Sequence, residues 1–472
     1  MEHRTKRDIA IITIVSDFES KLPKGDIGYL AEKTYIQIIE YYLEENKLKR
    51  ALEVVDLAIS QYAYRSEFYL TKAKILLQLN KPKRALKILK LGEKVSPFEI
   101  DIQLLKARAL SILQEYEQAL EIINTLKDAC NQSDLGDVLI TEAKFFELKK
   151  EYGLMYQCLA EALLLNMDDE DLYEQLWTSV ELSKNYIHCI ELNKKIIDKK
   201  PYSYLAWFNL GHAYSFTGEY EMAIDAFEYS FIINPEFENG YLDCADICVQ
   251  MKNYEKALKI LTESLGVVEN ECDTLLLISY CQIQLNNFKE AKYNLYKALK
   301  LDPYNDEVYF NLGICYTKEE QWQNAINSFH KAIAIEDSTE DYYLYLGLAY
   351  YELGSFDKAG QFLRKATAIA PEQSAFWSEY AKFLIKQGKD QLAIDILQEA
   401  DEYTFGADIL YCRSVAYLRT GRKNEAFEIL SEALMEGFDL HTIMYDIDPE
   451  LALDQEILSI IRYYKTENEE LL

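Results

Sequence analysis

The stretch that decides the fold is residues 203–236, SYLAWFNLGHAYSFTGEYEMAIDAFEYSFIINPE. Its apolar residues Trp207, Leu210 and Tyr214 recur at i, i+3 and i+7 and therefore share one face of a first helix. Gly218 suits the left-handed backbone that closes a helix C-terminus, and Pro235 ends a second helix because proline lacks the amide donor. The stretch predicts a helical hairpin.

Copies of this hairpin recur with a period of 34 residues. In two divergent units Met155 and Cys189 take the slot of the small residue Ala223, and a step of 36 residues places an insertion near residues 131–136. The small-residue slot is otherwise filled by Ala51, Ala85, Ala119, Ala257, Ala291, Ala325, Ala359 and Ala393, and one residue early by Ala426. The turn slot holds residues that tolerate positive φ: Asn46, Asn80, Gly218, Asn286, Gly354, Gly388 and Gly421.

The pattern W-x2-L-G-x2-Y, followed by an alanine, an aromatic residue and a proline, resembles the tetratricopeptide repeat, whose period is 34. The resemblance implies an all-α fold. The expected architecture is an α-solenoid, a right-handed superhelix of about twelve helix-turn-helix repeats with a C-terminal capping helix. Repeats of this family serve as protein-interaction scaffolds in many unrelated processes, so the resemblance implies a general function and no particular partner.

The repeat frame divides the whole chain. At the end of the repeats, Asp448 followed by Pro449 is typical of the N-cap and first residue of a helix, here the capping helix. The expected segments are a partly irregular lead-in with a short helix at 1–31, repeats 1–3 at 32–135, divergent repeats 4–5 at 136–203, repeats 6–12 at 204–440, and capping helices with an acidic tail at 441–472.

Composition narrows the class of partner. The formal net charge of -29 opposes binding to nucleic acid, whose phosphates are bound by clustered Lys and Arg. The apolar run Ile9–Val15 is too short for a secretion signal, and no segment offers the ~18 apolar residues that span a bilayer. We therefore expect a cytoplasmic protein without membrane insertion, in which the nine cysteines are reduced.

The sequence gives no sign of catalysis, cofactor or metal. Cys244 and Cys248 have the four-residue spacing of metal ligands on a helix, but both occupy apolar core slots of the repeat. The five histidines are scattered, and neither HExxH nor CxxC occurs. We expect no enzyme, no cofactor and no metal site.

The resemblance implies that unit positions 2, 5, 6, 9, 12 and 13 of the first helices face a concave groove. In the unit that begins at Tyr204 these positions include Phe208, Asn209, His212 and Phe216. These residues are either ligand contacts or ordinary helix-surface residues, and the sequence leaves both interpretations open. The candidate ligand-binding residues are Phe208, Asn209, His212, Asp243, Asp246, Tyr280, Phe310, Asn311, Tyr345 and Tyr351.

Three basic residues, Lys74, Arg108 and Lys144, occupy position 9 of successive early units. Family members that clamp the acidic tails of chaperones use a different set of positions, which no consecutive units supply here. The stripe either binds a carboxylate or balances local charge.

The leading hypothesis is a non-enzymatic scaffold that binds a peptide or a partner helix in the groove. The alternative is a regulatory sensor whose solenoid changes conformation on binding a small peptide or metabolite. Self-association through the tyrosine-rich surface also stays open.

Overall fold

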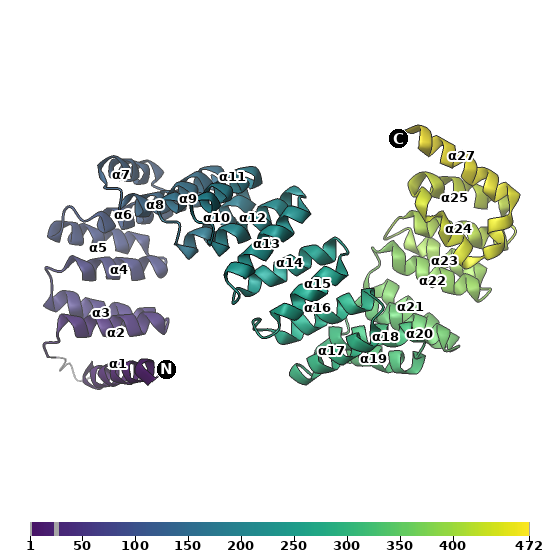
Figure 1. Ribbon diagram of the computed structural model, residues 1–472, viewed down its shortest axis with the longest axis horizontal. Helices are drawn as coiled ribbons and strands as arrows, with labels where there is room; N and C mark the ends of the chain where they lie inside the picture. The colour runs from purple at the N-terminus through teal and green to yellow at the C-terminus, as the bar shows by residue number, and fades with distance from the viewer. Residues whose placement is uncertain (1, 23–27, 472) are drawn as a thin grey trace. The chain divides into compact units, whose positions relative to one another are not determined.

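The computed structural model describes residues 2–22 and 28–471, with side chains described for residues 11–22 and 28–466. The described residues form helices joined by short turns and contain no strand. They divide into two compact units, Met1–Pro235 and Glu236–Leu472, and each unit is a succession of helix pairs (Figure 1). The predicted all-α solenoid of helix-turn-helix repeats is confirmed.

The helix pairs follow the repeat frame. The helices α8 and α16 begin one residue before the predicted unit start, and the other first helices begin at it. The first unit contains α1 (Glu2–Lys21), α2 (Glu32–Glu44), α3 (Leu48–Gln61), α4 (Ser66–Gln78), α5 (Pro82–Val95), α6 (Ile100–Ile112), α7 (Tyr116–Ala129), α8 (Leu135–Leu148), α9 (Tyr152–Leu165), α10 (Glu170–Ser183), α11 (Tyr186–Lys199), α12 (Tyr204–Thr217) and α13 (Tyr220–Ile233). The second contains α14 (Glu238–Gln250), α15 (Tyr254–Ser264), α16 (Glu271–Gln284), α17 (Phe288–Leu301), α18 (Asp306–Lys318), α19 (Trp322–Ile335), α20 (Glu340–Glu352), α21 (Phe356–Ile369), α22 (Ser374–Lys386), α23 (Asp390–Ala400), α24 (Ala407–Arg419), α25 (Lys423–Glu436), α26 (Ile443–Ile447) and α27 (Gln455–Leu471), with short 3-10 helices η2 (Phe438–Thr442) and η3 (Pro449–Leu453).

The turn inside each pair places one residue in the left-handed region. The predicted turn residues all have positive φ, between 53° and 82°. The same slot also imposes this conformation on residues that rarely adopt it, which the sequence did not predict, because packing of the two helices overrides the local preference. These residues are Gln114, Lys150, Lys184, Lys252 and Glu320.

Replacing one of these strained residues by glycine is expected to stabilise its repeat. Lys184 has φ 59°, where a Cβ is unfavourable, so Lys184→Gly should raise local stability by about 1 kcal/mol. The control Lys195→Gly lies in the interior of α11 and should lower stability by about 1 kcal/mol. Hydrogen exchange of the α10 and α11 amides measures both changes, and a loss of protection in Lys184→Gly would contradict the strain argument.

An aromatic side chain at unit position 4 joins consecutive repeats. Trp207 Nε1 donates a hydrogen bond to the Pro201 carbonyl at 2.9 Å, and Trp377 Nε1 donates to the Pro371 carbonyl at 2.9 Å. A buried aromatic body with a polar tip suits this position because the tip satisfies a carbonyl in the turn before the helix. Tyrosine hydroxyls make the equivalent bond in other repeats: Tyr69 to Ala63, Tyr173 to Met167, Tyr309 to Pro303 and Tyr343 to Asp337.

Four repeats carry a charged residue in the slot of Leu210, which the sequence did not identify as a feature. Each charge pairs with a residue of the preceding helix or of its C-cap, so the ion pair lies at the interface between two helix pairs. The pairs are Lys72 with Asp56, Lys106 with Glu93 at 2.9 Å, Glu142 with Lys127 at 2.5 Å, and Arg413 with Asp401 at 2.5 Å.

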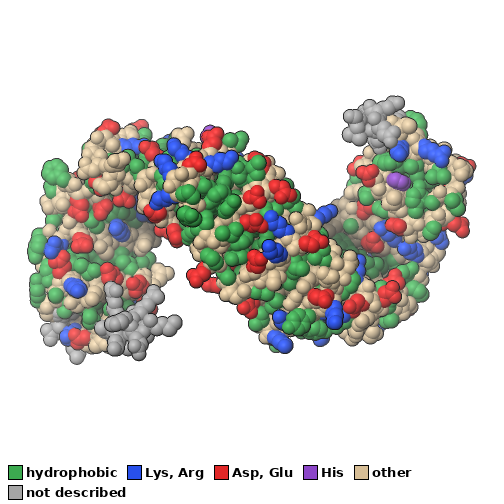
Figure 2. Space-filling view, viewed as in Figure 1, with side chains coloured by type: hydrophobic (Ala, Val, Ile, Leu, Met, Phe, Trp, Pro, Cys, Tyr) green, Lys and Arg blue, Asp and Glu red, His purple; other side chains and the backbone are tan. Residues whose placement is uncertain are grey.

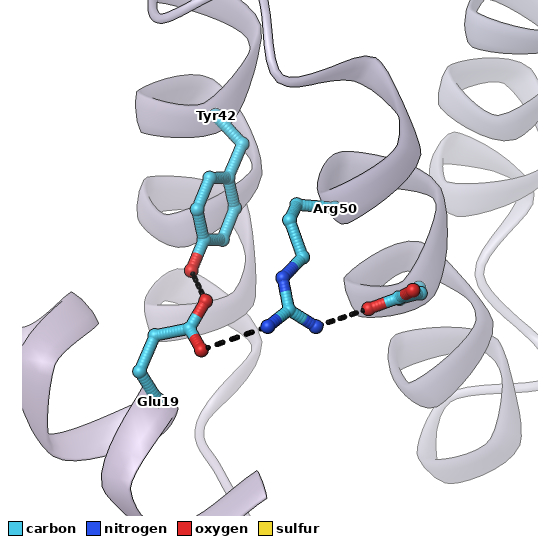
Figure 3. Close-up of polar contacts among 4 residues, drawn as sticks. Glu19, Tyr42 and Arg50 are labelled. Carbon is cyan, nitrogen blue, oxygen red and sulfur yellow. Dashed lines mark hydrogen bonds and ion pairs between the residues drawn. The ribbon is translucent and has the colours of Figure 1, made fainter.

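The N-terminal segment forms a longer helix than the short one expected. The helix α1 has 20 residues, and its Val15 and Phe18 are buried against the first repeat. Glu19 accepts hydrogen bonds from the Tyr42 hydroxyl at 2.5 Å and from Arg50 Nη2 at 3.2 Å (Figure 3). Burial, followed by the bond to Glu19, raises the pKa of Tyr42. Of the irregular part that was expected, residues 23–27 lie outside the described residues.

The C-terminal cap is built in two steps. Asp448 accepts a hydrogen bond from the Glu450 amide at 3.2 Å, and Pro449 follows it as predicted. These residues start the 3-10 helix η3, however, and the capping helix α27 begins only after Asp454, whose carboxylate accepts from the Glu456 amide at 2.9 Å. Ile457 of α27 is fully buried, so this helix covers the apolar end of the last repeat.

Candidate functional site

The first helices of the first unit gather aromatic side chains on one surface. Phe208 and His212 of α12 lie in edge-to-face contact, with ring centroids 4.4 Å apart, and both rings rest on buried Phe227. Trp177 of α10 stacks on His212 with centroids 4.8 Å apart. Two of the predicted residues, Phe208 and His212, are therefore brought together by the structure.

The exposed part of this cluster extends beyond the predicted residues. Phe216 is 53% exposed and stacks on Tyr186 of α11, with centroids 4.9 Å apart and the rings within 4° of parallel. Trp177 lies 5.7 Å from Phe216. We call Trp177, Tyr186, His212 and Phe216 the aromatic surface. Aromatic rings in this arrangement offer large rigid contact area to a partner.

The repeat pattern does not place Trp177 among the candidate residues, although the sequence contains a signal for it. It occupies the slot that holds Gly211, Gly313 and Gly347 in the best-preserved repeats. A Cβ on Gly211 would already lie 2.6 Å from the Phe227 ring. An indole does not fit beneath a neighbouring ring in that slot, so tryptophan there indicates a side chain directed to the helix surface.

Asn209 has a different role from the predicted one. It is 3% exposed, and its Nδ2 donates a hydrogen bond to the Tyr173 carbonyl of α10 at 3.1 Å. The amide therefore satisfies a buried carbonyl between two first helices, and it is not displayed to a ligand. We remove Asn209 from the candidate ligand-binding residues.

In the second unit, Phe310 and Tyr345 form a smaller group. Their centroids lie 5.3 Å apart in edge-to-face contact, and Tyr342 lies 4.9 Å from Phe310. Burial is the first cause that raises the pKa of Tyr345, followed by the nearby carboxylates of Asp341 and Glu379. Both rings are half-buried, so this group exposes less aromatic area than the aromatic surface of the first unit.

The remaining predicted residues are spread over α14–α20 and make contacts close to them in the chain or in the next repeat. Asp243 is half-buried on α14. Asp246 accepts from Gln250 at 2.7 Å, Asn311 donates to the Glu307 carbonyl at 2.9 Å, Tyr280 lies 6.2 Å from Tyr254, and Tyr351 lies 5.8 Å from both Phe356 and Phe383.

The predicted basic stripe is divided between two pockets of the first unit. Lys74 lines a pocket of about 510 Å³ between α2 and α4, together with Glu40 and Glu67. Arg108 and Lys144 line a smaller pocket of about 170 Å³ between α6 and α8. The three residues therefore do not form one uniform site.

The described residues offer little to catalysis or metal binding. They contain no group of three His, Cys, Asp or Glu side chains placed to hold a metal ion. Cys244 and Cys248 are fully buried as predicted, and burial raises the pKa of the Cys189 thiol to about 12. Thiols of this kind are poor nucleophiles at neutral pH. In the part of the chain that the structure describes, we also find no helix with the length and apolarity needed to cross a membrane.

Two family models match parts of the chain. A tetratricopeptide-repeat model matches residues 204–236 and 273–305, and a model of the anaphase-promoting complex, cyclosome, subunit 3 matches residues 318–400. The comparison with curated protein sequences gave no match. Similar solved structures include YrrB, described as a TPR protein with an unusual peptide-binding site, at 20% identity over 39% of this chain and 95% of that chain (TM-score 0.33). Others are the APC/C hetero-tetramer Cut9-Hcn1, at 15% identity over 96% and 94% (TM-score 0.38), and yeast Tom70, at 15% over 89% and 97% (TM-score 0.39).

Repeated helix pairs with a shared turn geometry define an α-solenoid protein built from helix-turn-helix repeats. Within that class, the chain contains tetratricopeptide repeats, which the family model matches at residues 204–236 and 273–305.

Proposed function

We propose that this protein is a non-enzymatic, cytoplasmic scaffold that binds an extended peptide or a partner helix on its first helices, with the aromatic surface as the main anchor. The observation that carries the proposal is the stack of Phe216 on Tyr186 beside Trp177, because a 53% exposed phenylalanine held by two rings is pre-organised for contact. Binding energy at interfaces concentrates in such aromatic residues. The nine free cysteines support a reducing compartment.

The test compares partners recovered with the unaltered chain and with Trp177→Ala/Phe216→Ala. Loss of two hot-spot rings is expected to weaken a captured partner by about 30-fold or more, which corresponds to about 2 kcal/mol. The matched control is Phe98→Ala, because Phe98 is 96% exposed in the turn between α5 and α6. A partner bound with equal affinity by both variants and the unaltered chain would falsify the aromatic anchor.

The same experiment bears on self-association. If the recovered partner is a second copy of the chain, the aromatic surface joins copies, and the double variant should lower the mass seen in sedimentation equilibrium. None of the contacts among the described residues specifically favours the alternative of a ligand-driven conformational sensor.

A further inference from the structure

The charge of the chain is unevenly distributed. Residues 1–148 carry 22 Lys and Arg against 23 Asp and Glu, whereas residues 149–472 carry 28 against 56. Figure 2 shows both signs of charge side by side over the first unit on the face that it presents. An acidic partner is therefore repelled least by residues 1–148, because Asp and Glu are in large excess in the rest of the chain.

The pocket between α6 and α8 contains two cations without an ion-pair partner. Arg108 and Lys144 line it with Glu147, and among the described residues no carboxylate lies within ion-pair distance of either cation. Other cations of the same repeats are paired: Lys106 with Glu93 at 2.9 Å and Lys127 with Glu142 at 2.5 Å. Arg108 and Lys144 therefore differ from these two cations, which have an ion-pair partner across a helix interface.

The electrostatics of this pocket are unfavourable in the absence of an anion. Burial, and then the neighbouring Arg108 guanidinium, lower the pKa of Lys144, while Glu147 acts in the opposite direction. Two cations and one carboxylate leave one positive charge in excess. One additional carboxylate would compensate it, and the planar guanidinium of Arg108 suits two parallel hydrogen bonds to such a group.

The neighbouring pocket between α2 and α4 selects for different chemistry. Its volume is about 510 Å³, and the half-buried Ile36, Leu43 and Leu48 contribute to an apolar lining. Glu40 and Glu67 outnumber Lys74 there, so the pocket disfavours an anion and accepts an apolar side chain. The two pockets are separated by two spacings between first helices. At about 10 Å for each spacing, the distance between the pockets is about 20 Å. An extended chain covers this distance in about six residues.

We propose that the first-helix surface of α2–α8 binds an extended acidic segment of a partner protein, with an apolar side chain in the α2/α4 pocket and a carboxylate between Arg108 and Lys144, about six residues apart. This site is separate from the aromatic surface, and either site can fail without the other. The carboxylate gives the pocket its missing charge, and the apolar residue fixes the direction and register of the segment.

An array of 12-residue peptides tests the spacing. Each peptide carries one Leu and one Glu in a Gly/Ser background, at separations from three to ten residues, and is probed with the full chain at low ionic strength. Binding is expected to be strongest near a separation of six, to fall at least tenfold when Glu is replaced by Gln, and to weaken as salt is raised. Binding that is independent of the separation, or equal for the Glu and Gln peptides, overturns the proposal.

Two double variants assign the site on the protein. Arg108→Gln/Lys144→Gln should abolish the preference for Glu over Gln peptides. The charge-matched control Lys87→Gln/Lys90→Gln, on the exposed side of α5, should keep it, as should Trp177→Ala/Phe216→Ala. If Lys87→Gln/Lys90→Gln also loses the preference for Glu over Gln peptides, the peptides bind by general charge attraction. This result overturns the assignment of the carboxylate to Arg108 and Lys144.

Hydrogen exchange of the α8 amides separates a binding role from a structural one. The charged form of Lys144 is disfavoured in the folded protein, so Lys144→Gln should leave the protection of these amides unchanged or raise it. Lower protection would show that Lys144 stabilises the fold and would contradict the excess charge assigned to this pocket.

Discussion

Gly313→Ala is expected to destabilise the pair α18 and α19 by about 1–3 kcal/mol, although alanine is the better helix former. A Cβ at this position would lie 2.3 Å from Cε1 of Phe329, a distance that real contacts do not show. Phe329 is fully buried, with Phe310 and Tyr345 against it, so its ring has little room to move. The close approach of the two helices therefore depends on the missing side chain.

Removing the ring should reverse the sign of this effect. Phe329→Ala alone should cost about 3–5 kcal/mol, as for other buried aromatic residues. In that background Gly313→Ala no longer meets a ring, and it should stabilise α18 by up to about 1 kcal/mol through helix propensity. Gly153→Ala in α9 is the matched control and should also stabilise, because the nearest atom to its Cβ lies 4.0 Å away.

Hydrogen exchange of the α18 and α19 amides is the suitable measurement, because a long repeat array does not unfold in one step. If Gly313→Ala has the same sign with and without the Phe329 ring, steric contact is not the reason for the glycine.

The sequence could predict what each repeat shares. Ala223 and Gly211 mark the places where two helices touch, and the resulting pattern recurs often enough to locate most first helices to the residue. The burial and hydrogen bond of Asn209 could not be predicted from this pattern. Its position in the frame is that of a groove residue, but the neighbouring helix brings the Tyr173 carbonyl within 3.1 Å, and this depends on the spacing of two helices.

The aromatic surface could also be predicted only in part from the repeat pattern. His212 and Phe216 follow from the frame, whereas Tyr186 lies at the start of a second helix and joins them only because α11 and α12 pack side by side. The helix α1 was underestimated for another reason. Its apolar run Ile9–Val15 has the composition of a short targeting signal, and the burial of Val15 and Phe18 against the first repeat is a tertiary effect.

The ion pairs in the Leu210 slot could not be predicted from the sequence either. Lys106 and Glu142 have opposite charge, and the frame gives both the position of a buried leucine. Each is tolerated because its partner, Glu93 or Lys127, lies on the preceding helix at the same interface. A buried charge without a partner is expensive, so these pairs make each interface depend on its correct neighbour.

The pair of Lys127 and Glu142 gives the second large effect. The Glu142 side chain is 8% exposed and accepts from Lys127 Nζ at 2.5 Å. Burial alone would lower the pKa of Lys127, but the hydrogen bond and charge of Glu142 together raise it. Lys127→Met should therefore leave a buried carboxylate without its cation and lower the stability of the α7/α8 interface by about 3 kcal/mol or more. The Cys158 thiol, which also lies near Glu142, cannot replace the lost cation. Burial, followed by Glu142, raises the pKa of this thiol to about 12, so it stays neutral.

Restoring the apolar residue of other repeats should rescue this variant. Lys127→Met/Glu142→Leu puts leucine where Leu210 stands in the best-preserved repeat, and replacing a buried ion pair by packed apolar residues is often neutral or stabilising. The double variant should thus be at least as stable as the unaltered chain. The exposed pair Lys149 with Glu151 is the control, and Lys149→Met should change stability by less than about 1 kcal/mol. Hydrogen exchange of the α7 and α8 amides distinguishes the outcomes: if the two single changes simply add, the ion pair is not coupled across the interface, and the charged slot needs a different explanation.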